Sequence, residues 1–128
     1  LPKLDVILAK YPITYTIAGH AGNGNFHIIP LMDFSDSDTA RIILNLSKEV
    51  YELVIEYKGS TTAEHNDGII RSPFILQMFG NKAYSLFEKT KYIFDAHNIF
   101  NPGKKVGSSI DYLKNHIIKE KHDLSHKV

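Results

Sequence analysis

The stretch that decides the fold is Gly19-His20-Ala21-Gly22-Asn23-Gly24-Asn25-Phe26-His27, in which two histidines bracket a glycine-rich loop. It lies within a segment from Ile13 to Asp33 that is rich in Ile, Thr, Tyr and Phe. These residue types favour strands, whereas the small and polar residues at 21–25 are typical of a loop. The sequence therefore predicts two extended segments, one on each side of that loop.

The spacing of the two histidines limits how they can act together. His20 and His27 are seven residues apart, and in an uninterrupted strand residues an odd number apart point to opposite faces. The loop must therefore fold or bulge if both rings serve one site, and Gly22 and Gly24 allow the positive φ angles that a kink needs. The alternative is an ordinary hairpin with two unrelated strand histidines, and spacing alone favours it.

Downstream of Asp33 the sequence predicts helices. Ser35 to Asp38 is an S-x-x-D start signal, and a long amphipathic helix should follow it until Gly59. The apolar residues that recur at helical spacing there are Ile43, Leu46, Val50, Leu53, Val54 and Tyr57.

The second half of the chain predicts shorter elements. A short helix is expected over 74–79, and a further helix that ends near Asn98 is marked by Ala83, Phe87, Thr90 and Phe94. The segment 101–104 has the composition of a turn. The end of the chain, 111–128, contains His116, His122 and His126 among lysines and is expected to form a polar helix that frays.

This order of elements is typical of an α+β fold with a partial antiparallel sheet covered by helices on one face. Two strands do not make a stable sheet by themselves. We therefore expect either association with a second copy through sheet edges, or further strands from the upstream part of a longer parent protein. The absence of an initiator Met before Leu1 favours a fragment.

Composition excludes several classes of protein. The 128 residues carry a net charge of +1, which provides no field that attracts nucleic acid or an anionic membrane surface. The chain has no cysteine, so a disulfide framework, a thiolate zinc site and an iron–sulfur cluster are excluded within it. The absence of cysteine and of a signal-peptide layout favours a cytoplasmic location. Any metal must use histidine and carboxylate ligands.

A second cluster of reactive side chains lies between positions 64 and 71. Glu64, His65, Asp67 and Arg71 fall within eight positions there. A solvated surface turn is the simpler interpretation, because charged residues are mostly exposed. Together with the two histidines of the first segment, however, one carboxylate would complete a two-histidine, one-carboxylate metal site.

Three ordered motifs carry a resemblance to a known family. The strings at 19–27, Ala-Glu-His-Asn-Asp-Gly-Ile-Ile-Arg at 63–71 and Phe-Asn-Pro-Gly-Lys at 100–104 resemble the C-terminal region of the FAD-linked oxidases. This group includes D-lactate dehydrogenase, the glycolate oxidase flavin subunit and D-2-hydroxyglutarate dehydrogenase, within the vanillyl-alcohol oxidase superfamily. The resemblance implies that residues 1–106 are the C-terminal part of a ferredoxin-like cap domain and that residues 107–128 are a polar helical tail.

The resemblance also implies roles for individual residues. His20, His27 and Glu64 would bind a divalent metal, most often zinc in this family, and His65 would be the catalytic base. Glu64 and Asn101 would lie on the cofactor side, with the Asn101 turn near the flavin ring. Arg71 would clamp a substrate carboxylate, although a surface ion pair is the alternative for a lone arginine.

The chain departs from the family pattern at three positions. Asn23 stands where relatives usually have Asp, which removes a negative charge beside the proposed metal ligands. Asn66 stands where relatives usually have Gly, and we expect it to keep the backbone because Asn tolerates the left-handed region. Ile29 replaces an Asn found in some relatives, so one substrate contact is expected to be missing.

The implied function is oxidation of a D-2-hydroxy acid of the lactate or glycolate type, with hydride transfer to FAD. The flavin would be bound mostly by an N-terminal FAD-binding domain absent from this chain, so the chain alone is expected to be inactive. One alternative is a stand-alone metal hydrolase that uses His65 or Asp67 as base. Another is a non-catalytic module that associates through its sheet edge.

Overall fold

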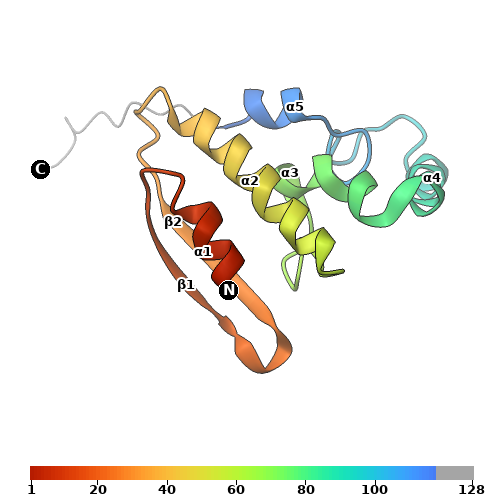
Figure 1. Ribbon diagram of the computed structural model, residues 1–128. Helices are drawn as coiled ribbons and strands as arrows, with labels where there is room; N and C mark the ends of the chain where they lie inside the picture. Colours follow the sequence, from red (N-terminus) through yellow and green to blue (C-terminus); the bar gives the residue numbers. More distant parts are fainter. Residues whose placement is uncertain (118–128) are drawn as a thin grey trace, which may run out of the picture. The chain divides into compact units, whose positions relative to one another are not determined.

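The computed structural model describes residues 1–117 of the chain. Along the sequence it contains α1 (Pro2–Leu8), β1 (Thr14–His20), η1 (Ala21–Asn23), β2 (Asn25–Leu31), α2 (Thr39–Glu56), α3 (Gly68–Arg71), η2 (Ser72–Phe74), α4 (Ile75–Phe94) and α5 (Ile110–Asn115) (Figure 1). Helices and an antiparallel pair of strands confirm the predicted α+β class. The described residues divide into two compact units, residues 1–46 and residues 47–116, with the division inside α2.

The predicted pair of strands forms an antiparallel hairpin in the first unit (Figure 1). Its register pairs Ile17 with Ile28 and Ala18 with His27. Along β1, half-buried and exposed residues alternate from Thr14 to Ala18, because successive side chains of a strand point to opposite faces. One face therefore carries the half-buried apolar residues Tyr15, Ile17, Ile28 and Pro30.

Gly19 is required where the two strands approach each other closely, opposite Phe26. Its φ of 150° lies in a region that other residues rarely adopt. A β-carbon at this position would lie only 2.2 Å from the backbone oxygen of Asn25. The hairpin next to His20 therefore depends on a residue without a side chain.

The buried apolar residues of the first unit come from two helices. Leu4 and Leu8 of α1 are buried, as are Ile42 and Leu46 of α2, and each pair has the four-residue spacing of one helix face. Helix α1 was not predicted from the sequence. Pro2 in its first turn, followed by apolar residues at this spacing, was the local signal that indicates it.

Helix α2 begins at Thr39, four residues after the start that the S-x-x-D signal indicates. Asp33 and Asp36 are the reason, because their side chains accept hydrogen bonds from the backbone N–H groups of Ser35 and Asp38, each at 2.8 Å. Such local bonds stabilise turns in place of a helix. The predicted amphipathic helix is otherwise confirmed, with Val50 continuing the buried stripe into the second unit.

The second unit is centred on buried side chains from η2, α4 and α5. Phe74, Ile75 and Leu113 are each at most 5% exposed, and the rings of Tyr51 and Phe74 meet edge to face with centroids 4.9 Å apart. Burying one such side chain contributes about 1.5–3 kcal/mol. Gly80 interrupts α4 with a φ of 74°, so the two helices predicted on either side of it are confirmed as two segments joined by a kink. The second segment ends at Phe94 and not near Asn98 as predicted, because Asp95 leaves the helical conformation.

The loop after α4 is fixed by Asp95. Its carboxylate accepts hydrogen bonds from the backbone N–H groups of Ile99 and Phe100, at 2.8 and 2.9 Å, and forms an ion pair with Lys91. The hydrogen bond from Lys91 and those from the two backbone groups hold the pKa of Asp95 below its ordinary value, against the opposing effect of burial.

The predicted terminal helix is observed in part. Helix α5 starts at Ile110, and the Oγ atom of Ser109 accepts a hydrogen bond from the N–H of Tyr112 as an N-cap. His116 stacks on the ring of Tyr112, with centroids 4.0 Å apart. His122 and His126 lie outside the described residues.

The close approach at Gly19 gives the first testable prediction. Gly19→Ala should destabilise the chain by about 1–3 kcal/mol, because the added β-carbon is incompatible with both the φ angle and the neighbouring strand. Gly22→Ala is the matched control, since a β-carbon there meets nothing within 4 Å. Urea unfolding of both variants measures the difference, and equal stabilities would contradict the role given to Gly19.

A second prediction concerns pH. The pKa of Asp95 is lower in the folded chain than its ordinary value of 3.8, so its stabilising effect is complete above that value and is lost as the pH falls further. Asp95→Asn should lower the melting temperature at pH 7 and reduce the loss of stability in acid. The exposed Glu88→Gln variant is the control, and wild-type acid sensitivity in Asp95→Asn would show that this carboxylate is not responsible.

Candidate functional site

The hairpin of the first unit brings His20 and His27 onto one face. His27 is paired with Ala18, and His20 lies two residues beyond Ala18 on the same side of β1, so the histidines are diagonal neighbours. Their ring centroids are 5.8 Å apart and the ring planes are at 84°. The hairpin that the spacing favoured is observed, and its chain reversal brings the two histidines to one face although they are an odd number of residues apart.

The loop between the two histidines is a short turn. Residues Ala21–Asn23 form η1, and Gly24 then adopts a φ of 64° and donates its N–H to the oxygen of Ala21. Of the two glycines expected to permit a kink, Gly24 is the one with a positive φ. Asn23 is exposed in this turn.

The histidine face of the hairpin is the more exposed one. His20 is exposed and His27 is half-buried. Ile29 lies two residues beyond His27, and therefore on the same face, with 45% of its surface exposed. An apolar side chain thus stands on this face at the position where the family resemblance led us to expect a missing substrate contact.

In the second unit, Glu64 and His65 form a pair at the tip of an irregular segment. The Nε2 atom of His65 is 3.4 Å from a carboxylate oxygen of Glu64, and both side chains are about half exposed. The N–H of His65 donates to the oxygen of Thr62, which forms a turn. Both groups are thus held together while remaining accessible to a ligand.

Asn66 adopts the left-handed conformation, with a φ of 64°, as expected for a residue that replaces glycine. Its backbone oxygen accepts a hydrogen bond from Nη1 of Arg71 at 2.9 Å. Arg71 also lowers the pKa of Tyr51, although burial of the phenol dominates and raises that pKa overall. Arg71 is therefore a partly buried residue that supports the turn, and its guanidinium charge is fixed there.

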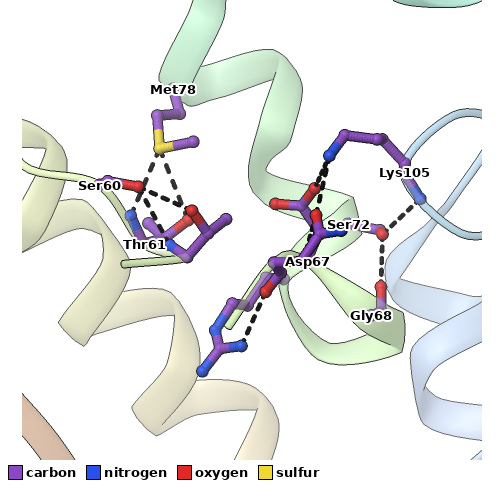
Figure 2. Close-up of polar contacts among 10 residues, drawn as sticks. Ser60, Thr61, Asp67, Gly68, Ser72, Met78 and Lys105 are labelled. Carbon is purple, nitrogen blue, oxygen red and sulfur yellow. Dashed lines mark hydrogen bonds and ion pairs between the residues drawn. The ribbon is translucent and has the colours of Figure 1, made fainter. Parts of the chain in front are cut away.

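Asp67 and Lys105 were not assigned to the site together by sequence reasoning. The carboxylate of Asp67 is almost completely buried and forms an ion pair with the Nζ atom of Lys105. Figure 2 shows this ion pair beside Ser72, whose Oγ atom accepts a hydrogen bond from the N–H of Lys105 at 2.6 Å. The sequence offered no local signal for the contact, because Lys105 is far from both residues along the chain.

The other end of this segment, before Glu64, is held by Thr61. Its N–H and hydroxyl groups contact the sulfur of Met78 at 3.4 and 3.6 Å (Figure 2). Thr61 is buried, in contrast to Glu64 and His65. The irregular segment that carries the reactive pair is therefore fixed at both of its ends.

Asn101 lies in the predicted turn, which α5 supports. Asn101 is exposed and has a φ of 47°, and the hydroxyl of Tyr112 donates to the oxygen of Pro102 at 3.1 Å. Gly103 is needed here, because a β-carbon would lie 2.7 Å from the Tyr112 ring. The side chain of Asn101 is thus presented on a well-supported turn.

The paired imidazoles of the hairpin suit a borderline divalent metal. Two imidazoles on one tetrahedral zinc ion, with Zn–N bonds of about 2.0–2.1 Å, have ring centroids roughly 5–6 Å apart. The His20–His27 separation of 5.8 Å fits this arrangement. A carboxylate is a usual third ligand of zinc beside two imidazoles, and such a set leaves a position open for substrate.

Comparison with known proteins identifies the family. The family described as FAD linked oxidases, C-terminal domain, matches residues 1–105, and the chain belongs to this family. The chain is 34% identical to the glycolate oxidase subunit GlcD of Bacillus subtilis over 101 residues, or 79% of its length. It is 31% identical to D-2-hydroxyglutarate dehydrogenase of Escherichia coli over 104 residues, or 81% of its length.

A third relative is the probable mitochondrial D-lactate dehydrogenase of Danio rerio, 30% identical over 80% of this chain. The chain spans 22%, 10% and 20% of the length of these three relatives. No solved structure matches it significantly. Among residues 1–117, no helix has the length and apolar character needed to cross a membrane.

Proposed function

We propose that this chain forms the substrate side of an FAD-dependent oxidoreductase that oxidises a D-2-hydroxy acid of the lactate or glycolate type. Membership of the FAD-linked oxidase family over residues 1–105 supports the reaction class. The relatives named for glycolate, D-lactate and D-2-hydroxyglutarate support the class of substrate. The observation that carries the proposal is the pairing of His20 with His27 on one hairpin face.

The metal is proposed to be zinc, held by His20, His27 and Glu64. Two imidazoles and a carboxylate match the ligand preferences of zinc better than those of magnesium or calcium, which favour oxygen ligands. Each unit contributes a part of this set that is accessible to a ligand, the histidine pair from β1 and β2 and the half-exposed Glu64 from the second unit.

The chemistry follows from the groups beside these ligands. A divalent metal held by His20, His27 and Glu64 would lower the pKa of a bound hydroxyl, and FAD would supply the acceptor for the hydride from C2 of the acid. His65 is proposed to take the hydroxyl proton, because imidazole is the most common general base and its Nε2 atom lies next to Glu64. Glu64 would then serve both as ligand and as the partner that orients His65.

Arg71 and Asn101 are proposed to complete the site. Arg71 carries a fixed positive charge beside the Asn66 turn, which would favour the substrate carboxylate. Asn101 is exposed on its turn and would face the flavin. FAD itself is proposed to be bound mainly by a flavin-binding domain outside these 128 residues, with 1–106 as the cap region and 107–128 as a tail.

The metal assignment predicts a result for zinc titration. Isothermal titration of zinc into the chain should show one site, and His20→Ala and His27→Ala should each weaken its affinity by at least about tenfold. His97→Ala is the matched control, because this exposed histidine lies outside the proposed ligand set. Unchanged affinity in both hairpin variants would remove the metal from the proposal.

The reaction itself is tested in the parent-length protein by following flavin absorbance. D-2-hydroxy acids should bleach the flavin, and His65→Gln should slow this step by about 10²–10⁴-fold. Arg71→Met should mainly raise the KM, since it removes a carboxylate contact. A parent protein that takes up no FAD, or that hydrolyses its substrate without flavin, would contradict the proposed function.

A further inference from the structure

We propose that Lys105 is a positioning residue that fixes the Glu64–Asn66 turn to the segment following Asn101, and that the Asn66 side chain is part of this link. The inference rests on the proposed function, because that function gives Glu64 and His65 their roles. It concerns contacts within the second unit alone.

Lys105 contacts the segment of the reactive pair at three points. Its Nζ atom lies 2.5 Å from Oδ2 of Asp67 and donates to Oδ1 of Asn66 at 2.9 Å. Its backbone N–H donates to Oγ of Ser72 at 2.6 Å. Figure 2 shows the side chain of Lys105 reaching Asp67 while its backbone contacts Ser72. One residue therefore joins stretches 33 to 39 positions apart.

The burial of Asp67 makes this link strong. Its side chain is 3% exposed, whereas that of Lys105 is 50% exposed. A buried carboxylate needs a partner, and loss of the lysine would leave the charge of Asp67 without its cation. The Glu64–Asn66 turn directly precedes Asp67, so a shift of Asp67 towards solvent would move Glu64 and His65 as well.

Asn66 adds a contact that a glycine at this left-handed position would be unable to make. Glycine would adopt the same φ of 64°, but it has no oxygen to offer. The Oδ1 atom of Asn66 accepts both the Nζ of Lys105 and the N–H of Asp67, each at 2.9 Å. The Asn66 side chain thus provides a second attachment for Lys105.

The backbone of Lys105 points to the same conclusion. Lys105 has a φ of 64°, a left-handed conformation that costs energy for a residue with a side chain. Such a conformation persists where the surroundings determine it, and strained residues cluster at functional sites. Here the bond to Ser72, which itself donates to the oxygen of Gly68, holds the strained backbone in place.

The contacts of Lys105 differ from those of its neighbour Lys104. Lys104 lies over the ring of Tyr112, 6.0 Å from the centroid, and contacts the support of the Asn101 turn instead. The two lysines are adjacent, equally charged and on the same loop. Lys104→Met is therefore the control, because it makes the same change of charge and side chain one position away and leaves the contact with Asp67 intact.

The test compares Lys105→Met, Lys105→Arg and Lys104→Met by amide hydrogen exchange and zinc titration. Lys105→Met should raise exchange at 64–68 by about tenfold and weaken zinc binding by about 10- to 100-fold. Lys105→Arg should recover much of the exchange protection and of the zinc affinity. Lys104→Met should show the same amide exchange as the wild type at 64–68. In the parent enzyme, Lys105→Met should lower kcat more than it raises KM, because Glu64 and His65 lose alignment.

A double-mutant cycle adds a second criterion. Asp67→Asn removes the buried charge that Lys105 neutralises. The double variant Asp67→Asn with Lys105→Met should therefore lose less free energy of unfolding than the two single variants lose together. Additive effects, or unchanged exchange at 64–68 in Lys105→Met, would overturn the inference, as would an equal rise in exchange across the whole second unit. If the wild-type parent reduces no flavin, the proposed function fails, while exchange still decides whether Lys105 fixes the turn.

Discussion

The register of the β1–β2 hairpin is the constraint on which the candidate site depends. Gly19 allows the strands to approach closely opposite Phe26, and this fixes the pairing of Ala18 with His27. A shift of one residue in the register would turn every side chain of one strand to the other face and separate the two rings. The 5.8 Å separation of the imidazoles is therefore a property of the backbone pairing as much as of the histidines themselves.

The second unit uses polar contacts where the first uses strand pairing. The segment around Glu64 has no regular secondary structure, so its backbone groups need other partners. Arg71 binds the oxygen of Asn66, and Lys105 reaches both Asn66 and Asp67. These contacts leave Glu64 and His65 half exposed on a turn whose base is buried. Such support is what a precisely oriented base or ligand requires.

The sequence predicted the helices and strands that depend on residue type and on the spacing of apolar residues. The hairpin, the amphipathic stripe of α2 and the break in α4 followed from residue type and periodicity. The left-handed conformation of Asn66 was expected from the family resemblance, which implies glycine there, together with the tolerance of asparagine for that region. The start of α2 was displaced because Asp33 and Asp36 form side-chain hydrogen bonds that compete with the first turn of the helix.

Contacts between distant segments were beyond the reach of those patterns. Nothing near Lys105 in the sequence indicates that its ammonium group meets a carboxylate 38 positions upstream. The same holds for Tyr51, whose burial raises its pKa and whose ring meets that of Phe74 edge to face. The role of α5 in supporting the Asn101 turn through Tyr112 also depends on tertiary packing.

The central claim is that His20, His27 and Glu64 form one metal site that orients a 2-hydroxy acid. Anomalous diffraction at the zinc edge from crystals of the parent-length protein, grown with zinc and a D-2-hydroxy acid, tests it most directly. The account predicts a single strong peak bonded to the two imidazoles and to the Glu64 carboxylate, at about 2.0–2.2 Å. A hairpin without a peak, or a peak on other ligands while the acid is bound, would contradict it.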